Sequence, residues 1–475
     1  MRVRALTPIL VLLLAAGAAA AATPPPTPPT PPTTPTPPSA TAKTGPVFIV
    51  TGGGWGHGVG MSQWGAYGQA KVGRTFDQIL SYYYTGTELG DAPTVISNRL
   101  RVLIADNVPA VTLTSLVPFS VADATGTRYP LPAGDTIVSP TLELPVGPLG
   151  EPVQLVGPIQ FRPGKGSPLK VRNMSYRGEL RISSNTKRLQ VVNVVPLESY
   201  LLGVVPGEMP KDWPIEALKA QAVAARTYAI GNLLKGKPYD LYSDWRSQMY
   251  YGVEHEASGP TQAVRDTKGK VVTFQGKVAQ VFYFSSSGGR TANAVDVYGN
   301  DVPYLVSVDD PWDVASPYHR WPPRQLTGLE LAKAFGLAQP VVDAEYVPGV
   351  QGSPAQIILT TATGISAPFR TTDVRARLAL RSSTFKLGIL NLSPPGKTGK
   401  PGAAVKVSGI ARDVDGAVIE RRVTGGTWAS VAQVKPAADG TFTATLRPTT
   451  TTTYRLTAAG VGGLAVTVKV AGPTT

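Results

Sequence analysis

Short runs of alternating apolar and polar residues occupy much of the chain between residues 99 and 195. Alternation with a period of two indicates β-strands, and residues 189–195 form the clearest of these runs. Residues 215–234 differ, because their apolar side chains recur three and four positions apart, as on one face of a helix: Ile215, Leu218, Ala222, Ala225, Ala229 and Leu233. Since strands and helices occupy separate stretches, the pattern predicts an α+β fold, a β-rich core with a few helices.

Proline and capping signals predict where the helices begin. Pro196 and Pro214 each precede a helical stretch, and proline suits the first turn of a helix because its missing N–H would be unpaired there. We expect the first of these helices to end at Gly203, leaving a stiff Pro/Gly loop before Pro214. A helix is also expected from about residue 61, and residues 75–78 form a capping box that predicts another through residue 84.

The beginning of the chain has the composition of an exported protein. Residues 8–22 are entirely apolar and follow two arginines, which predicts a signal peptide over residues 1–22; an uncut membrane anchor is the alternative. Residues 23–44 are rich in Pro and Thr and predict an extended linker. No later segment reaches 18 uninterrupted apolar residues, so we expect a secreted protein with no membrane span after signal cleavage.

A second change in composition, at residues 394–402, divides the remainder of the chain. We interpret residues 45–393 as the core, residues 394–402 as a linker and residues 403–475 as a separate module. The last segment has alternating runs and Asp-Gly turns, which predict a small all-β sandwich of the immunoglobulin-like (Ig-like) type.

Charge and cysteine content narrow the classes of function. The chain has 45 Lys and Arg against 31 Asp and Glu, a formal net charge of +14. Such a balance favours polyanionic surroundings such as nucleic acid, acidic lipid or an anionic cell wall, and export argues against nucleic acid. There is no cysteine. Disulfides, thiolate catalysis and Cys-ligated metal sites are therefore excluded.

Glu208 is the carboxylate that the sequence places best for chemistry. It follows Val204-Val205-Pro206-Gly207 and precedes Met209-Pro210. A carboxyl group with apolar neighbours has a raised pKa and can hold a proton near neutral pH, as a general acid requires. A Glu that caps the next helix or faces solvent would have the same local sequence, so spacing alone leaves both readings open.

The sequence around Glu208 also resembles a known family. Residues 197–210 contain Leu-Glu-Ser-Tyr-Leu and Gly-Val-Val-Pro-Gly-Glu-Met-Pro, and residues 213–229 continue with Trp-Pro-Ile-Glu-Ala-Leu-Lys-Ala-Gln-Ala-Val-Ala-Ala-Arg-Thr-Tyr-Ala. This run resembles the core of the stage II sporulation protein D (SpoIID/LytB) family. The resemblance implies peptidoglycan glycan strands as the partner, with members acting as lytic transglycosylases or associating with a wall amidase. The family's catalytic Glu falls on Glu208.

Two further blocks carry the resemblance. Tyr-Phe-Ser-Ser-Ser-Gly-Gly-Arg-Thr at residues 283–291 belongs to a central block that spans residues 170–313. Gly-Trp-Gly-His-Gly lies in a glycine-rich block at residues 52–87. In the family the glycine-rich block usually closes the core, whereas here it opens it. Such a circular shift is acceptable if the termini of the core lie close together.

Five residues of these blocks are expected to contact the glycan: Trp55, His57, Trp64, Ser287 and Arg290. The tryptophans could stack on sugar faces, and we expect His57 to be a hydrogen-bonding residue of the groove rather than a base. The Arg290 guanidinium could pair with the lactyl carboxylate of muramic acid. The alternatives are a tight turn before a helix for the glycine-rich block, and an internal ion pair with Asp296 for Arg290.

Other readings of these motifs are weaker. The glycine-rich block could be mistaken for a dinucleotide loop, but no βαβ unit follows it. The serines at 285–287 lack the Gly-x-Ser-x-Gly elbow of a serine hydrolase. Some relatives hold zinc with His and Cys near the central block, but this chain has Phe284 where a His often stands. We therefore predict no metal site and no cofactor.

Three functions are carried forward. The first is a lytic transglycosylase in which Glu208 alone serves as acid and then base, giving 1,6-anhydro-muramyl ends. The second is a non-catalytic wall-binding protein that recruits or enhances an amidase, which the linker and sandwich would also suit. The third is a two-carboxylate muramidase with Glu198 or Asp244 as partner. Glu198 is more simply a structural hydrogen-bonding residue.

Overall fold

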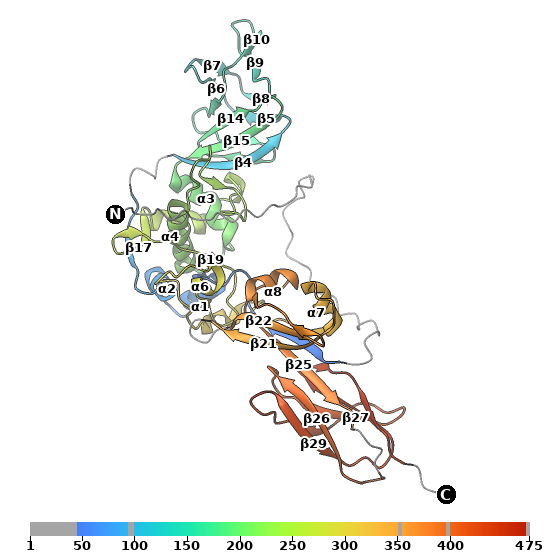
Figure 1. Ribbon diagram of the computed structural model, residues 1–475. Helices are drawn as coiled ribbons and strands as arrows, with labels where there is room; N and C mark the ends of the chain where they lie inside the picture. Colours follow the sequence, from blue (N-terminus) through green and yellow to red (C-terminus); the bar gives the residue numbers. More distant parts are fainter. Residues whose placement is uncertain (1–44, 94–98, 350–353, 396–399, 472–475) are drawn as a thin grey trace, which may run out of the picture. The chain divides into compact units, whose positions relative to one another are not determined.

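The computed structural model describes residues 45–93, 99–349, 354–395 and 400–471 (Figure 1). The predicted signal peptide and the whole predicted Pro/Thr linker, residues 1–44, lie outside these residues. The described part is an α+β protein rich in strands, as the sequence predicts. Within these four ranges, no helix is both long and apolar enough to cross a membrane.

A β-rich region follows the first helices and is built around a seven-stranded sheet, in the order β16-β4-β15-β14-β11-β6-β7. Its strands are β16 (Leu241–Tyr242), β4 (Leu100–Val108), β15 (Leu189–Val195), β14 (Glu179–Ser184), β11 (Ile159–Arg162), β6 (Phe119–Ala122) and β7 (Arg128–Leu131). A second sheet contains β13 (Met174–Tyr176), β12 (Leu169–Val171), β5 (Val111–Ser115) and β8 (Gly134–Val138), and a hairpin contains β9 (Glu143–Pro145) and β10 (Pro152–Gln154). The strand predicted at residues 189–195 is confirmed with the same bounds.

Several helices lie together in the region whose sequence resembles the SpoIID/LytB family (Figure 1). They are α1 (Gln63–Lys71), α2 (Phe76–Tyr83), α3 (Leu197–Glu208), α4 (Ile215–Gly231), α5 (Ser258–Asp266) and α6 (Ala294–Tyr298), with 3₁₀ turns at Val253–His255 and Pro311–Ala315. Helix α4 contacts α1, α2, α3 and α5. Its alanines are buried on several faces, so α4 is the central helix of this region. The capping box at Thr75 and Gln78 is confirmed.

Helix α3 departs from the prediction that it ends at Gly203. It continues for five more residues, passes through Pro206 and ends at Glu208 itself. Gly203 serves close packing instead, because a Cβ added there would lie 2.9 Å from the Gly252 carbonyl oxygen and from the Tyr250 ring. A Cβ added at Gly207, one turn later, would likewise lie 2.7 Å from the Met249 carbonyl oxygen. The two glycines thus let the segment at residues 249–252 lie directly against α3.

Short strands connect the helical region to the glycine-rich block. β2 (Met61–Ser62) pairs in parallel with β19 (Tyr283–Phe284). β17 (Lys270–Phe274) pairs with β3 (Glu88–Asp91) and β18 (Lys277–Val278). The predicted helix near residue 61 begins at Gln63, because the Ser62 side chain accepts a hydrogen bond from the N–H of Gly65 as an N-cap.

The first described strand, β1 (Val47–Gly52), pairs with strands from the other end of the core. It lies between β20 (Arg324–Thr327) and β25 (Phe385–Ser393) in a five-stranded sheet that continues through β26 (Val405–Arg412) to β29 (Thr441–Leu446). One face of this sheet packs on α7 (Gly328–Phe335), α8 (Thr371–Arg377) and a sheet of β21 (Val341–Pro348), β22 (Pro354–Thr361), β23 (Gly364–Ile365) and β24 (Phe369–Arg370). The termini of the core therefore lie side by side.

The C-terminal region is an all-β sandwich, as predicted. Its second sheet contains β27 (Val418–Arg422), β28 (Ala429–Gln433), β30 (Thr452–Ala458), β31 (Val461–Gly462) and β32 (Val466–Val468). Strand β1 contributes to two cores: Phe48 and Val50 face the α7/α8 side, whereas Ile49 packs in the sandwich. The sandwich core is thus shared with strands β1 and β25.

Candidate functional site

The carboxyl group of Glu208 lies at the C-terminal end of α3, against the segment that packs on the two glycines. Its Oε1 atom accepts a hydrogen bond of 2.7 Å from the backbone N–H of Met249. The Tyr283 hydroxyl provides a second hydrogen bond. One backbone donor and one phenol therefore fix the orientation of the carboxyl group, while the residue as a whole is half-buried.

The surroundings of Glu208 favour its protonated form. Burial raises the pKa of the Glu208 carboxyl from 4.5 to about 7, against the hydrogen bonds from Met249 and Tyr283, which lower it. Four tyrosines lie close enough to interact electrostatically with this group: Tyr200, Tyr228, Tyr251 and Tyr283. At neutral pH the carboxyl group therefore exists in both protonation states, which suits a group that must give and take a proton.

A buried glutamine holds the tyrosines in place. The Gln248 amide donates hydrogen bonds to the Tyr283 hydroxyl at 2.9 Å and to the Ala225 carbonyl oxygen at 3.2 Å. Its own oxygen accepts a hydrogen bond from the Tyr200 hydroxyl at 3.2 Å. The Tyr283 hydroxyl, which accepts from Gln248, is left to donate to Glu208. The order of these residues in the sequence gives no sign of this network.

Helix α1 joins the glycine-rich block to Glu208. The Gln63 side chain donates hydrogen bonds to the backbone carbonyl of Glu208 at 3.1 Å and to Gln221 at 3.3 Å. The next residue, Trp64, packs in a cluster with Tyr67 and Trp213, with ring centroids 4.8–5.4 Å apart. Trp64 thus directly follows a residue that contacts Glu208, and Trp213 packs on it although sequence reasoning did not assign Trp213 a role.

The glycine-rich block lies directly on the central block. The backbone of Trp55 forms an isolated antiparallel β-bridge with Ser286, and that of Val59 forms a parallel one with Ala292. The N–H of Trp64 donates to the Ser285 carbonyl at 3.0 Å. The block that stands first in this chain therefore adjoins the segment of the central block that contains Tyr283, whatever its place in the sequence.

His57 lies on the opposite side of strand β19 from Glu208. Its ring packs on Phe282 and Phe284, with centroids 6.0 and 5.4 Å apart, whereas the intervening Tyr283 side chain reaches Glu208. The Val59 N–H donates to Nδ1, so Nε2 carries the proton and donates to the Tyr283 carbonyl at 3.0 Å. Burial lowers the pKa of His57 to about 4. His57 is therefore neutral and positions the backbone of Tyr283.

Ser287 is buried and committed to hydrogen bonds within the protein. Its hydroxyl donates to Asp310 at 2.8 Å and accepts from the Gly289 N–H at 3.0 Å. The buried Asp313 accepts from the Ser286 hydroxyl and the N–H groups of Ser287 and Gly288. The serine-glycine turn is thus organised by two aspartates that sequence reasoning grouped with this block without giving them a role.

Arg290 and Trp55 are accessible. Arg290 forms an ion pair of 2.6 Å with Asp309 and a hydrogen bond with Ser307, so its acidic partner differs from the Asp296 considered as the alternative. The Trp55 ring, 37% exposed, packs on Tyr318 and under the Arg381 guanidinium. Trp55 could therefore offer one face to a sugar, whereas Ser287 could not reach one.

The two carboxylates considered as partners for Glu208 are both paired. Glu198 forms a bidentate ion pair with the buried Arg226, at 2.7 and 2.8 Å, and accepts a hydrogen bond from Gly269. Asp244 forms an ion pair of 2.7 Å with Arg246. Both contacts favour structural roles for these two carboxylates.

The described residues contain no group of three or more His, Asp or Glu side chains arranged to hold a metal ion. Phe284 is buried, and its Cβ lies 2.7 Å from the position of a Cβ added at Gly56. The aromatic ring thus fills space beneath the glycine-rich block.

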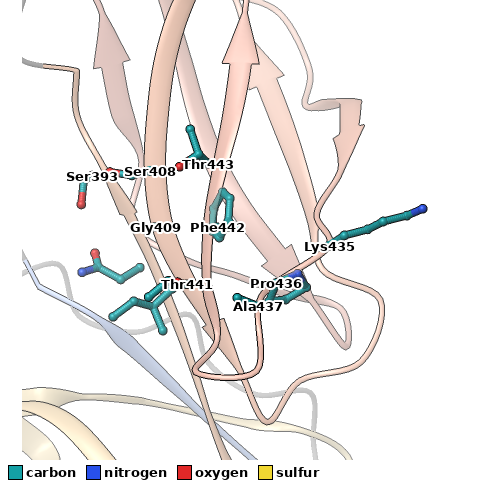
Figure 2. Close-up of a pocket in the computed structure, with 11 residues that line it drawn as sticks. Ser393, Ser408, Gly409, Lys435, Pro436, Ala437, Thr441, Phe442 and Thr443 are labelled. Atoms are coloured by element: carbon teal, nitrogen blue, oxygen red, sulfur yellow. The ribbon is translucent and has the colours of Figure 1, made fainter.

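A pocket of about 670 Å³ lies in the C-terminal region (Figure 2). Eight residues from three adjacent strands line it, and six of them form two cross-strand rows: Ser393, Ser408 and Thr443 in one row, and Asn391, Ile410 and Thr441 in the other. Lys435, Pro436 and Ala437 form one edge of the pocket (Figure 2). The lining is about equally polar and apolar, and no carboxylate is among its residues.

Comparisons with known proteins match the part of the chain that contains Glu208. The family described as SpoIID, stage II sporulation protein, matches residues 185–274. Stage II sporulation protein D of Bacillus subtilis is 31% identical over 215 residues, which are 42% of this chain and 62% of that protein. An uncharacterized protein of Brachyspira hyodysenteriae is 38% identical over 160 residues, 31% of this chain and 44% of that protein.

A protein named amidase enhancer, also from Bacillus subtilis, is 42% identical over 113 residues, 24% of this chain and 15% of that protein. The matches thus span less than two thirds of the length of these curated relatives. The family match includes α3, Glu208 and the segment at residues 248–252 that contacts them. Residues 185–274, which include Glu208, therefore match the SpoIID family model, and the chain is similar to stage II sporulation protein D over part of its length.

Proposed function

We propose that this protein is a secreted peptidoglycan lytic transglycosylase that acts in the cell wall and uses Glu208 as its single acid and base. The observation that carries the proposal is the carboxyl group of Glu208, whose pKa burial raises to about 7 and whose orientation Met249 and Tyr283 fix. The aromatic cluster of Trp64, Tyr67 and Trp213, joined to Glu208 through Gln63, supports a sugar-binding surface beside it.

The reaction would proceed in two proton transfers. Protonated Glu208 gives its proton to the glycosidic oxygen as the bond between muramic acid and glucosamine breaks. The resulting carboxylate then takes the proton from the C6 hydroxyl of the same muramic acid as that oxygen attacks the anomeric carbon. The product is a 1,6-anhydro ring, Glu208 is protonated again, and no water is consumed. One carboxyl group with a pKa near 7 suffices for both steps.

A non-catalytic role as partner of a wall amidase is the second candidate. It is favoured by the 42% identity to a protein named amidase enhancer. The two-carboxylate muramidase has less support, because Glu198 and Asp244 are held in ion pairs with Arg226 and Arg246. The three functions differ in their products: anhydro-muramyl ends, no cleavage, or reducing ends.

Product analysis of the purified protein tests the proposal. We expect anhydro-muramyl ends from the parent protein, on intact or stem-stripped glycan, and a fall of about 10²–10⁴-fold in Glu208→Gln, the usual range for loss of acid–base catalysis. Glu345→Gln is the matched control, because Glu345 is exposed and no hydrogen bond or ion pair involves its side chain in the described part of the chain. Parental rates in Glu208→Gln would reject the catalytic role. A parent that cleaves neither substrate would leave the amidase-partner function.

A further inference from the structure

One tryptophan of the described chain is almost fully exposed to solvent. Trp245 is 83% exposed, whereas Trp55, the next most exposed tryptophan, is 37% exposed. Within the described ranges the Trp245 indole has no aromatic partner and no hydrogen bond. A single exposed apolar side chain needs no explanation by itself, so the surroundings of Trp245 decide what it can do.

The turn that carries Trp245 is held by its own contacts. The Ser247 N–H donates to the Asp244 carbonyl oxygen at 2.8 Å, and the Tyr242 N–H donates to the Ser247 hydroxyl at 3.1 Å. The Arg246 guanidinium binds both carboxylate oxygens of Asp244, at 2.7 and 2.9 Å, and lies over the Tyr242 ring. The indole is therefore exposed on an ordered turn, and the charges of the two residues that flank it cancel.

The segment that begins with this turn reaches Glu208 four residues later, where the Met249 N–H donates to the Glu208 carboxyl group. Four residues of fully extended chain cover at most about 14 Å, so the Cα atoms of Trp245 and Met249 lie no farther apart than that. A β-1,4-linked glycan strand covers such a distance with a few sugars. A strand bound at Glu208 is therefore long enough to reach Trp245.

Burial alternates along the same segment: Gln248, Tyr250 and Gly252 are buried, and Ser247, Met249 and Tyr251 are half-buried. A period of two places the half-buried set on one outward-facing side. The Tyr251 ring lies beside Glu208, because a Cβ added at Gly207 would be 3.1 Å from that ring. The segment thus presents one aromatic ring next to the Glu208 position and a second, Trp245, at its far end.

We propose that Trp245 is a sugar platform, whose indole stacks on an N-acetylglucosamine ring of the glycan strand a few sugars from the bond at Glu208. The inference rests on the proposed function for the identity of the strand. The apolar C–H face of a pyranose matches the flat face of an indole. Because Asp244 and Arg246 neutralise each other, the turn suits uncharged N-acetylglucosamine better than muramic acid, whose lactyl carboxylate would meet no free cation there.

Calorimetric binding to Glu208→Gln protein, in which turnover is prevented, tests the platform. The probes are oligomers of β-1,4-linked N-acetylglucosamine of increasing length. We expect their affinity to rise with length. Adding Trp245→Ala should leave the affinity for short oligomers unchanged and weaken that for long ones about tenfold, as loss of an aromatic anchor commonly does. Trp245→Tyr should restore most of the affinity, because a phenol ring can also stack on a sugar.

Leu149→Ala is the matched control, because Leu149 is 96% exposed and lies in the hairpin between β9 and β10. It should leave the affinity for every length unchanged. Equal affinity of Trp245→Ala and Leu149→Ala for long oligomers would overturn the inference, and so would affinity that does not rise with length or an equal loss at all lengths.

Cleavage of glycan strands by the parent protein is measured separately, so that the two proposals can fail independently. Loss of affinity for long oligomers in Trp245→Ala, together with no cleavage by the parent, would retain the platform and reject the transglycosylase. Cleavage by the parent, together with equal affinities of Trp245→Ala and Leu149→Ala, would retain the transglycosylase and reject the platform.

Discussion

At the scale of single residues, opposing influences set the chemistry of Glu208. Burial favours the neutral carboxyl, and the hydrogen bonds from Met249 and Tyr283 favour the carboxylate. Burial prevails, so the pKa rises to about 7 rather than falling below 4.5. His57 stays neutral from pH 5 upward, because its pKa is about 4. Ionisation of Glu208 should therefore dominate the pH dependence of the reaction near neutrality.

The rate of anhydro-muramyl release should fall as the pH rises above about 7, because the first step needs protonated Glu208. Tyr283→Phe removes a donor to the carboxylate, so it should raise the pKa of Glu208 further and move this descending limb to higher pH by up to about one unit. Initial rates between pH 5 and 9 measure the shift. Tyr129→Phe, in β7, should leave the limb in place. A limb that moves to lower pH in Tyr283→Phe would contradict the assigned hydrogen bond.

Folding stability should depend on the same group with a definite sign. The pKa of Glu208 is about 7 in the folded state and 4.5 ordinarily, so between these values the folded protein holds a proton that the unfolded chain releases. Its contribution to the free energy of unfolding is therefore complete below pH 4.5 and is lost as the pH rises through 7. The free energy of unfolding of Glu208→Gln, measured relative to that of the parent, should therefore be higher at pH 8.5 than at pH 4, by on the order of 2–3 kcal/mol. Urea unfolding at the two pH values measures this gain, and a relative loss would contradict it.

At the scale of elements, the sequence predicts what local signals determine. Capping residues and spacing place the helices near residues 75 and 215, and alternation places the strand at 189–195, because these signals lie within the element itself. The end of α3 is different. Gly203 resembles a helix stop, but its missing side chain makes room for Tyr250, which is distant in the sequence. The sequence names Glu208 as a candidate, but it does not indicate Met249 and Tyr283, which lie against the carboxyl group, or Gln248, which contacts Tyr283, since tertiary packing brings them there.

Gly207→Ala tests the packing of α3. The added Cβ would lie 2.7 Å from the Met249 carbonyl oxygen and 3.1 Å from the Tyr251 ring, so the segment that donates to Glu208 must move. We expect a loss of stability of about 1–3 kcal/mol, as for other overpacked sites, together with at least a tenfold loss of anhydro-muramyl release. Gly364→Ala is the control, because nothing lies within 4 Å of its added Cβ. Full activity in Gly207→Ala would show that the donated N–H is dispensable.

At the scale of the whole molecule, one strand joins regions that the sequence separates. Strand β1 pairs with β20 and β25, and β25 pairs onward with β26 of the sandwich. The predicted division at residues 394–402 follows composition, whereas pairing crosses it. This pairing explains how the glycine-rich block can open the core and still adjoin the central block: β1 brings the two ends of the core together.

A chain ended at residue 393 should therefore be less stable than the full chain. It would uncover Ile49, Leu390 and Leu392, which are buried in the sandwich core. We expect a lower melting temperature and increased aggregation, because an uncovered apolar sheet face promotes association. Ile49→Ala in the full chain should cost about 2–5 kcal/mol through the cavity it leaves. Unchanged melting of the truncated chain would show that the sandwich contributes nothing to the core.

The position of β1 also bears on the order in which the chain can fold. Its partners begin at residue 324, so a chain that leaves the ribosome or a secretion channel N-terminus first holds Val47–Gly52 without its native partners until almost the whole core has followed. Contacts so far apart in sequence are slow to form, because the closure of a long loop precedes any gain from pairing. Completion of the core thus waits for the last part of the chain to arrive. A product cut short before residue 385 keeps an unpaired apolar strand edge, which quality-control proteases could recognise.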